Sequence, residues 1–230
     1  MKIDKPDALR GILKAASALL LDFDGPICSI FSSFPSIMVA DILRSIARDR
    51  GYTDLPISIQ MTKDPFTIFR HSAILDEELA RALEEAMTEC ELRAVETADE
   101  TAGSRELIYE WNKSKRPIFV VSNNSVKSIS KYLDIHELTT FITGISARTS
   151  HNPSTLKPNP HLVRAALQHL QISPSEAIFV GDSDTDSTAG IEAGVRNIGY
   201  ANKPHKKAMF ELVKVDAIVN DMTLLAAAAR

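Results

Sequence analysis

Short apolar runs alternate with helical segments along most of this 230-residue chain, and this alternation constrains the fold more than any other feature. We predict strands at 18–23, 117–122, 177–181, 195–199 and 217–220, with a weaker one at 141–145. These runs are nearly all apolar, as in parallel strands covered by helices on both faces. Helical patterns lie at 125–134, 158–171, 184–194, 204–214 and 221–229. The repetition predicts an α/β fold with a doubly wound, Rossmann-like parallel sheet.

One interval, residues 33–98, has no strand signal and contains only helical patterns. Gly51 is placed to stop one helix, and Asp64 followed by Pro65 is a typical start for another. The stretch LDEELARALEEAMTECELRAV has the periodicity of a long amphipathic helix. We therefore predict an all-helical cap over 33–98, inserted after the first strand into an α/β core made of residues 1–32 and 99–230.

Composition and charge narrow the class of protein. Hydrophobic residues make up 44% and charged residues 24%, which is ordinary for a globular protein, and the net charge of -4 predicts no nucleic-acid partner. No apolar run approaches the length of a membrane-spanning helix, and AASALLL is better explained as a buried strand than as a signal peptide. Cys28 and Cys90 have no metal-ligand spacing. A disulfide stays possible, but a reduced, cytoplasmic protein is favoured. The sequence does not indicate an oligomeric state.

Acids, a hydroxyl, an amide and a lysine follow the predicted strands or open the helices between them. In open parallel sheets, the working site lies beyond the carboxyl ends of the strands. We therefore expect these side chains to meet at one edge, although they are scattered along the chain. They are Asp22, Asp24, Ser122, Asn123, Lys157, Asp182 and Asp186.

The chemistry of these side chains indicates phosphoryl transfer. Asp22 and Asp24 are one residue apart, so each raises the cost of ionising the other unless a cation or a shared proton relieves it. Mg²⁺ prefers oxygen ligands and commonly binds one or two carboxylates together with substrate phosphate. Asp22 and Asp182 are suited to this role. Ser122 and Lys157 are suited to holding phosphoryl oxygens, where fixed positive charge is needed.

The four segments DFDG, VVSNN, LKPNP and FVGDSDTD resemble the four signature motifs of the haloacid dehalogenase superfamily, in the correct order. The similarity covers roughly residues 15–30 and 100–230. Any one motif is weak evidence, but all four lie at a predicted strand end or helix start, which makes the combination specific. The helical insert matches the position of the cap in the phosphoglycolate-phosphatase-like branch of this superfamily.

The resemblance implies a role for each motif residue in the chemical steps. Asp22 is implied as the nucleophile that forms an aspartyl-phosphate intermediate. Asp24 is implied as the acid that protonates the leaving group and then as the base that activates water. Ser122 and Lys157 are implied to bind the transferring phosphoryl group, with the backbone near Asn123 assisting.

The resemblance also implies Mg²⁺ as the cofactor. Asp22, Asp182 and the main-chain carbonyl of Asp24 are the implied metal ligands, and Asp186 is implied to hold either Lys157 or metal-bound water. The chain departs from the family pattern at one position, because Pro26 stands where threonine is frequent. A proline there stiffens the turn that leaves the strand but removes none of the carboxylates.

The predicted function is hydrolysis of a small phosphorylated metabolite, with the cap closing over the site to exclude water. In the cap, Lys63, Arg70 and His71 are candidates for recognising the substrate, although an exposed basic helix face explains them equally well. A phosphomutase of the same superfamily and a catalytically silent protein that binds a phosphorylated ligand stay open as alternatives. A dehalogenase is disfavoured by Asp24, because that branch lacks the second acid.

Two further hypotheses fit the sequence less well. A signalling receiver carries its phosphorylated aspartate after a middle strand, where this chain has Ser122, and it has no large insert. The run DSDTDS resembles a calcium loop in its alternating acids. An EF-hand, however, needs glycine at the sixth position and glutamate at the twelfth, and those positions hold Ser187 and Ala193.

Overall fold

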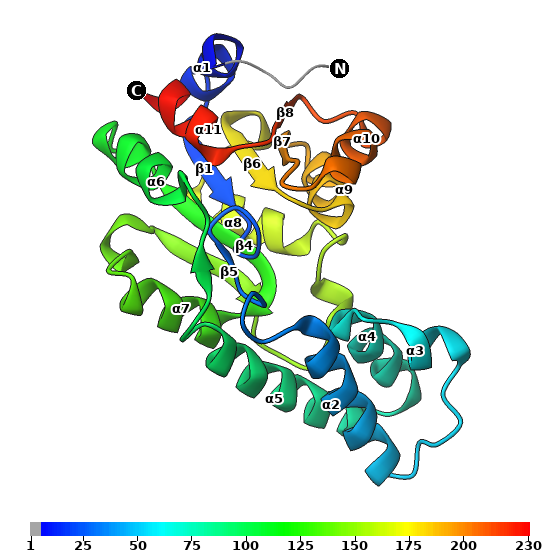
Figure 1. Ribbon diagram of the computed structural model, residues 1–230. Helices are drawn as coiled ribbons and strands as arrows, with labels where there is room; N and C mark the ends of the chain where they lie inside the picture. The colour runs from blue at the N-terminus through cyan, green and yellow to red at the C-terminus, as the bar shows by residue number, and fades with distance from the viewer. Residues whose placement is uncertain (1–5) are drawn as a thin grey trace.

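The computed structural model describes residues 6–230, so residues 1–5 of the predicted core lie outside the described part. Its main feature is a parallel sheet with the strand order β5-β4-β1-β6-β7-β8 (Figure 1). The strands are β1 Ala18–Leu21, β4 Ile118–Ser125, β5 Gly144–Arg148, β6 Ala177–Gly181, β7 Arg196–Tyr200 and β8 Ala217–Val219. The chain adds strands first to one side of β1 and then to the other. This order confirms the predicted doubly wound α/β fold.

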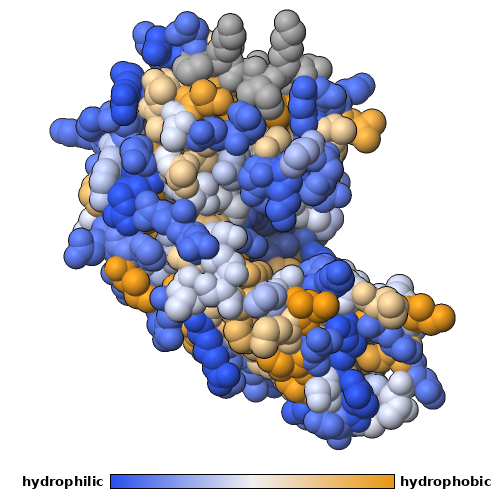
Figure 2. All heavy atoms as spheres, viewed as in Figure 1, coloured by the Kyte–Doolittle hydropathy of each residue, from blue (hydrophilic) through white to orange (hydrophobic). Residues whose placement is uncertain are grey.

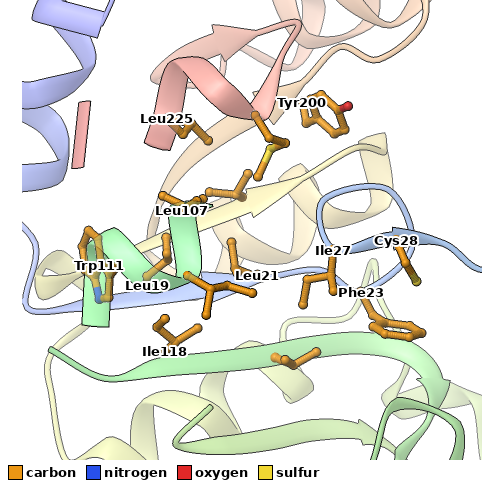
Figure 3. Packing of buried hydrophobic residues seen from close by; sticks show 14 of the residues in the cluster. Leu19, Leu21, Phe23, Ile27, Cys28, Leu107, Trp111, Ile118, Tyr200 and Leu225 are labelled. Carbon is orange, nitrogen blue, oxygen red and sulfur yellow. The ribbon is translucent and has the colours of Figure 1, made fainter. Parts of the chain in front are cut away.

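The strands are buried on both faces, which explains their unbroken apolar runs. Leu19 and Leu21 of β1 face one side of the sheet and Leu20 faces the other. On the first side, helices α1 Pro6–Lys14, α6 Ser104–Lys113, α7 Val126–Ile135 and α11 Met222–Ala229 supply the core. Figure 3 shows Leu19, Leu21 and Ile118 beside Trp111 of α6. Helices α8 His161–Leu170 and α9 Asp184–Ala193 cover the second side, and α10 Pro204–Val213 packs near β7.

Two strands differ from their predicted bounds in ways that affect the site. The weak strand predicted at 141–145 begins later, at Gly144, because residues 139–141 form a turn of 3-10 helix. β4 continues past Ser122 to Ser125, and its pairing with β5 shifts between these two residues. The polar residues that were expected after the strand therefore lie within its irregular last part.

Helices alone occupy the segment between Ser36 and Ala94: α2 Ser36–Asp49, α3 Ile57–Met61, α4 Pro65–Leu75 and α5 Glu77–Ala94. Asp64 caps α4, since its carboxylate accepts hydrogen bonds from the backbone of Phe66 and Thr67 at 3.0 and 3.1 Å. Gly51 has a φ of +89°, which suits the turn after α2. Figure 1 shows α2, α3 and α4 beyond the sheet, with α5 running back from them toward α7.

A short antiparallel ribbon, β2 Cys28–Ser29 with β3 Asp99–Glu100, joins the two chain segments on either side of these helices. The sequence did not predict this ribbon. The division of the chain at residues 33 and 98 stays a prediction. Within residues 6–230, no helix combines the length and apolar character that a membrane crossing requires.

Candidate active site

All the motif residues that were singled out in the sequence line one pocket at the carboxyl ends of β1, β4 and β6. The pocket has a volume of about 200 Å³. Its lining includes Asp22, Asp24, Ser122, Asn123, Lys157, Asp182 and Asp186. Figure 2 shows a recess with hydrophilic residues at its rim, between the sheet and the part of the molecule formed by α2–α4. Side chains from widely separated parts of the chain therefore meet here, as the topology predicts.

Lys157 lies at the centre of the ion pairs in this pocket. Its ammonium donates to Asp22 Oδ1 at 2.8 Å and to the carbonyl oxygen of Val121 at 3.0 Å. It also pairs with Asp186 Oδ1 at 2.5 Å. Lys157 is only 1% exposed, so its charge is held almost entirely by protein groups. The Lys157 ammonium thus links Asp22 of the first motif with Asp186 of the fourth motif.

The backbone of Lys157 is fixed by two other side chains. The Asn123 side chain accepts from the Lys157 backbone N–H at 2.8 Å and donates to its carbonyl at 3.1 Å. Arg70 of α4 donates from Nη2 to the same carbonyl at 2.8 Å. The Asn123 side chain therefore positions Lys157.

Ser122 does not cap the helix that follows it. Its hydroxyl donates to Asn124 Oδ1 at 3.2 Å, and it is 1% exposed. The cap of α7 is Ser125, whose hydroxyl accepts from the backbone of Ser128 at 3.2 Å. β4 continues through Ser125 and α7 starts at Val126, one residue after the predicted start, so the Ser122 side chain stays in the pocket wall.

Asp182 and Asp186 have different surroundings although both follow β6. Asp186 Oδ2 accepts from the backbone N–H groups of Asp182 and Ser183 at 3.1 and 3.0 Å, and from the Ser183 hydroxyl at 2.6 Å. Asp182 contacts Lys206, a short ion pair, and accepts from Asn202 at 3.2 Å. Asp186 is thus locked in place, whereas Asp182 is held from the side of α10.

Burial and mutual repulsion make these carboxyl groups hard to ionise. Burial, with the charges of Asp186 and Asp182, raises the pKa of Asp22 above its usual range, although Lys157 lowers it. Burial and the Asp182 charge raise the pKa of Asp24 to about 7. Burial and the Asp186 charge raise the pKa of Asp182. An added cation in this pocket would favour the ionised forms of all three groups.

The carboxylates are close enough to share a cation. Ligand atoms of Asp22, Asp182 and Asp186 all lie within 4.8 Å of one another. Gly25 allows the Asp182 carboxyl group to lie close to the turn after β1, because a Cβ at position 25 would overlap that carboxyl group. Its φ of +109° also suits glycine, and Pro26 directly follows it in the turn. The oxygen donors fit a hard divalent ion such as Mg²⁺.

The three cap candidates lie in different places. Arg70 lines the pocket that holds Asp22. Lys63 lines a second, larger pocket of about 790 Å³, which shares Asp24 and Asp182 with the first. His71 is not brought to either pocket and lies instead beside a hollow formed by residues 51–56.

Several lining residues were missed by the sequence analysis. They are Asp64 of the helical segment and Asn124, Ser183 and Thr185 of the core, all of which line the smaller pocket. Asn124 lies inside the VVSNN motif, and Ser183 and Thr185 lie inside FVGDSDTD, so both motifs carried a signal for them. Asp64 had only the signal of a helix start, because its approach to the core depends on how α4 packs.

The fold and this pocket define a doubly wound α/β protein with an acidic, lysine-containing site at the carboxyl edge of its sheet. A family model described as haloacid dehalogenase-like hydrolase matches residues 20–200. The chain therefore belongs to the haloacid dehalogenase-like hydrolase family, as the four motifs predicted.

Similar proteins of known sequence or structure agree with this placement. Pyrophosphatase PpaX of Bacillus mycoides is 25% identical over 118 residues, which are 51% of this chain and 54% of the relative. The chain thus spans about half the length of the curated relatives that it matches.

Two solved structures share the fold. One is a HAD-superfamily hydrolase of subfamily IA from Geobacter sulfurreducens, with a TM-score of 0.58, 22% identity, and coverage of 91% of this chain and 94% of that chain. The other is CbbY from Rhodobacter sphaeroides in complex with phosphate, with a TM-score of 0.67, 17% identity, and coverage of 90% and 95%.

Proposed function

We propose that this protein is a Mg²⁺-dependent phosphatase that hydrolyses a small phosphorylated metabolite. The observation that carries the proposal is the meeting of Asp22, Asp24, Lys157 and Asp182 in one pocket. The names of similar proteins support it, because they include a pyrophosphatase and a protein crystallised with phosphate.

Asp22 is the proposed nucleophile. The Lys157 ammonium donates to Oδ1 and so orients the carboxylate of Asp22. The backbone N–H of Asp22 donates to the carbonyl oxygen of Val180 at 2.9 Å. Attack by an Asp22 oxygen on phosphorus forms an aspartyl phosphate and breaks the bond to the leaving oxygen. Lys157 then offsets the negative charge of the phosphoryl group, and the Ser122 hydroxyl donates a hydrogen bond to it after turning away from Asn124 Oδ1.

Asp24 is the proposed acid and base. The carboxyl group is half-buried, and its Oδ1 accepts from the backbone N–H of Ile30 at 3.1 Å, so its orientation is set by the turn after β1. Burial raises the pKa of Asp24, which favours the protonated form that can donate to the leaving oxygen. The carboxylate that remains takes a proton from the water that attacks the aspartyl phosphate.

Asp22 and Asp182 are the side chains that would hold Mg²⁺, together with the Asp24 main-chain carbonyl. Asp186 is unsuited as a direct ligand, because its oxygens are already engaged by Lys157, Ser183 and two backbone N–H groups. When bound, the metal supplies positive charge near the transferring phosphoryl oxygens. Lys206 contacts Asp182 Oδ2 and would compete with the metal for that oxygen.

The second pocket is the proposed place for the leaving group. It adjoins the first at Asp24, Asp64 and Asp182 and is larger, at about 790 Å³. Two lysines, Lys63 and Lys203, line it beside five acidic residues, so its lining does not favour a further anionic group on the leaving group. Arg70 reaches the smaller pocket instead and is the proposed cap contact to the phosphoryl group.

Hydrolysis of an aryl phosphate tests this proposal, with inorganic pyrophosphate as a second substrate. We expect turnover with Mg²⁺, loss of turnover with EDTA, and none with the Asp22→Asn protein. Metal-dependent turnover that survives in the Asp22→Asn protein would refute the mechanism. A well-folded protein that hydrolyses neither compound with Mg²⁺, and that fails to bind inorganic phosphate, would refute the function.

A further inference from the structure

A buried ion pair lies behind the wall of the phosphoryl pocket. Arg148 is the last residue of β5, and Glu91 lies near the end of α5. Both side chains are 1% exposed. The Arg148 Nη1 and Nη2 atoms donate to the Glu91 Oε1 and Oε2 atoms, each at 3.0 Å. This parallel two-bond geometry is the strongest form of the arginine–carboxylate pair.

Every N–H group of the Arg148 guanidinium has a partner. Besides Glu91, Nε donates to Glu84 Oε1 at 3.1 Å and Nη2 donates to the Thr88 hydroxyl at 3.2 Å. Glu84, Thr88 and Glu91 share one face of α5 because they are four and three residues apart. The fifth N–H, on Nη1, donates to the carbonyl oxygen of Asn123 at 2.8 Å. Arg148 therefore ties the irregular last part of β4, residues 122–125, to α5; we call this segment the 122–125 loop.

Glu91 holds the same loop from the other side. Its carboxylate accepts from the Ser125 backbone N–H at 2.8 Å, from Asn124 Nδ2 at 3.1 Å and from the Ser128 hydroxyl at 3.2 Å. A carboxylate only accepts hydrogen bonds, so the Asn124 amide must turn its NH₂ group toward Glu91. Its oxygen then faces Ser122 and accepts from the Ser122 hydroxyl at 3.2 Å.

Stability alone does not account for this buried ion pair. Removing two charges from water is costly, and an apolar pair of similar size is often as stable. Here the donors and acceptors are directed at the loop of residues 122–125, which forms the pocket wall. Neither Glu91 nor Arg148 lines the pocket itself.

We propose that Glu91 and Arg148 are positioning residues, which hold the loop of residues 122–125 in the conformation that binds a phosphoryl group. Arg148 fixes the carbonyl of Asn123. Glu91 fixes the side-chain amide of Asn124 and the backbone N–H of Ser125, so the two residues together hold the backbone of this loop. This inference rests on the proposed function of the pocket. It adds that α5, the last helix of the predicted cap segment, forms part of the support of the phosphate site.

The test is direct binding of inorganic phosphate, measured by calorimetry in the presence of Mg²⁺. The Glu91→Gln side chain has the same shape but no charge, and it presents an NH₂ group where the loop needs an acceptor. We expect phosphate to bind about tenfold more weakly, the effect of losing one well-placed hydrogen bond to a charged group. The Michaelis constant for an aryl phosphate should rise in parallel.

Glu84→Gln is the matched control. Glu84 pairs with the same arginine from the same helix but makes no hydrogen bond to residues 122–128. We expect its phosphate affinity to stay within roughly twofold of the unsubstituted protein. A smaller folded fraction lowers kcat alone, whereas a displaced loop raises KM, so the two constants separate loss of fold from loss of position.

Further outcomes decide the inference. Equal phosphate affinity of the Glu91→Gln and unsubstituted proteins would overturn it. If Glu91→Gln does not fold, Arg148→Lys replaces it, since lysine keeps the charge but cannot serve five acceptors. Unchanged affinity in Arg148→Lys would also overturn the inference. Failure of the unsubstituted protein to bind phosphate would instead overturn the proposed function, and the inference with it.

Discussion

Replacing Lys157 with methionine removes the cation that lies between two buried carboxylates. Methionine has a similar length but no charge, and the lysine side chain is only 2% exposed beside Asp22 and Asp186. Removing one partner of a buried ion pair costs about 3–5 kcal/mol. The free energy of unfolding of a typical domain is about 5–15 kcal/mol, so the variant should remain folded but should unfold at a much lower urea concentration.

The cost of Lys157→Met should depend on pH. Lys157 lowers the pKa of Asp22, while burial and the neighbouring acids raise it, so the variant should have a still higher Asp22 pKa. When folding raises the pKa of a carboxyl group, the free energy of unfolding of the protein falls as the pH rises toward that pKa. Because the pKa of Asp22 is already raised to about 8 beside Lys157, the destabilisation should be smaller at about pH 5 than at about pH 9.

Urea denaturation in EDTA at these two pH values measures the effect. Lys131→Met is the matched control, because Lys131 forms an ion pair with Glu96 at 2.5 Å but is 36% exposed. Such an exposed pair contributes about 0–1 kcal/mol, with little dependence on pH in this range. The reasoning would be refuted if Lys157→Met lowered the free energy of unfolding no more than Lys131→Met does, or lowered it equally at both pH values.

Three other substitutions test separate parts of the site. Asp24→Asn should slow both chemical steps, and normal turnover would exclude the acid–base role of Asp24. In EDTA, the free energy of unfolding of the unsubstituted protein should fall between about pH 4 and pH 7, because the folded-state pKa of Asp24 is raised to about 7, and this fall should be absent in Asp24→Asn. Arg70→Met removes a charge from the pocket and a hydrogen bond to Lys157, so the KM for an aryl phosphate should rise about tenfold; an unchanged KM would exclude a role in binding. Gly25→Ala should weaken Mg²⁺ binding in a calorimetric titration, because the new methyl group would overlap Asp182 at a φ of +109°; unaltered Mg²⁺ affinity would show that this approach is not needed.

The sequence predicted those parts of the fold that depend on local pattern. β6 has its predicted bounds because an unbroken apolar run is closed by the polar residues that follow Gly181. The cap of α4 at Asp64 was visible because Asp-Pro is a strong local start signal. The motif residues were expected at one edge because parallel strands place their carboxyl ends together, and the pocket contains all seven.

Other features depend on tertiary contacts that a single sequence does not show. The later start of β5 is an example, since Gly144 pairs with Phe119, and a Cβ at Gly144 would meet the Phe119 ring. The ribbon of β2 and β3 pairs residues far apart in the chain. Arg148 and Glu91 belong to no motif, and their pairing follows only from how α5 crosses the end of β4.

Helices α1 and α6 were also missed. Both lie outside the strand–helix alternation that guided the prediction, since α1 precedes the first strand and α6 follows the helical segment. The cap of α7 by Ser125 depends on the pairing of β4 with β5, because several polar residues in a row precede this helix and the local sequence does not show which one begins it.

The most direct measurement concerns Asp22 itself. The Asp24→Asn protein, which should break down the aspartyl phosphate slowly, is mixed with an aryl phosphate and Mg²⁺, quenched in acid and digested, and the peptides are analysed by mass spectrometry. We predict one added phosphoryl group on the peptide that contains Asp22, and none when Asp22 is also replaced by asparagine. Hydrolysis of the aryl phosphate with the phosphoryl group on another residue, or on none, would contradict the proposed nucleophile.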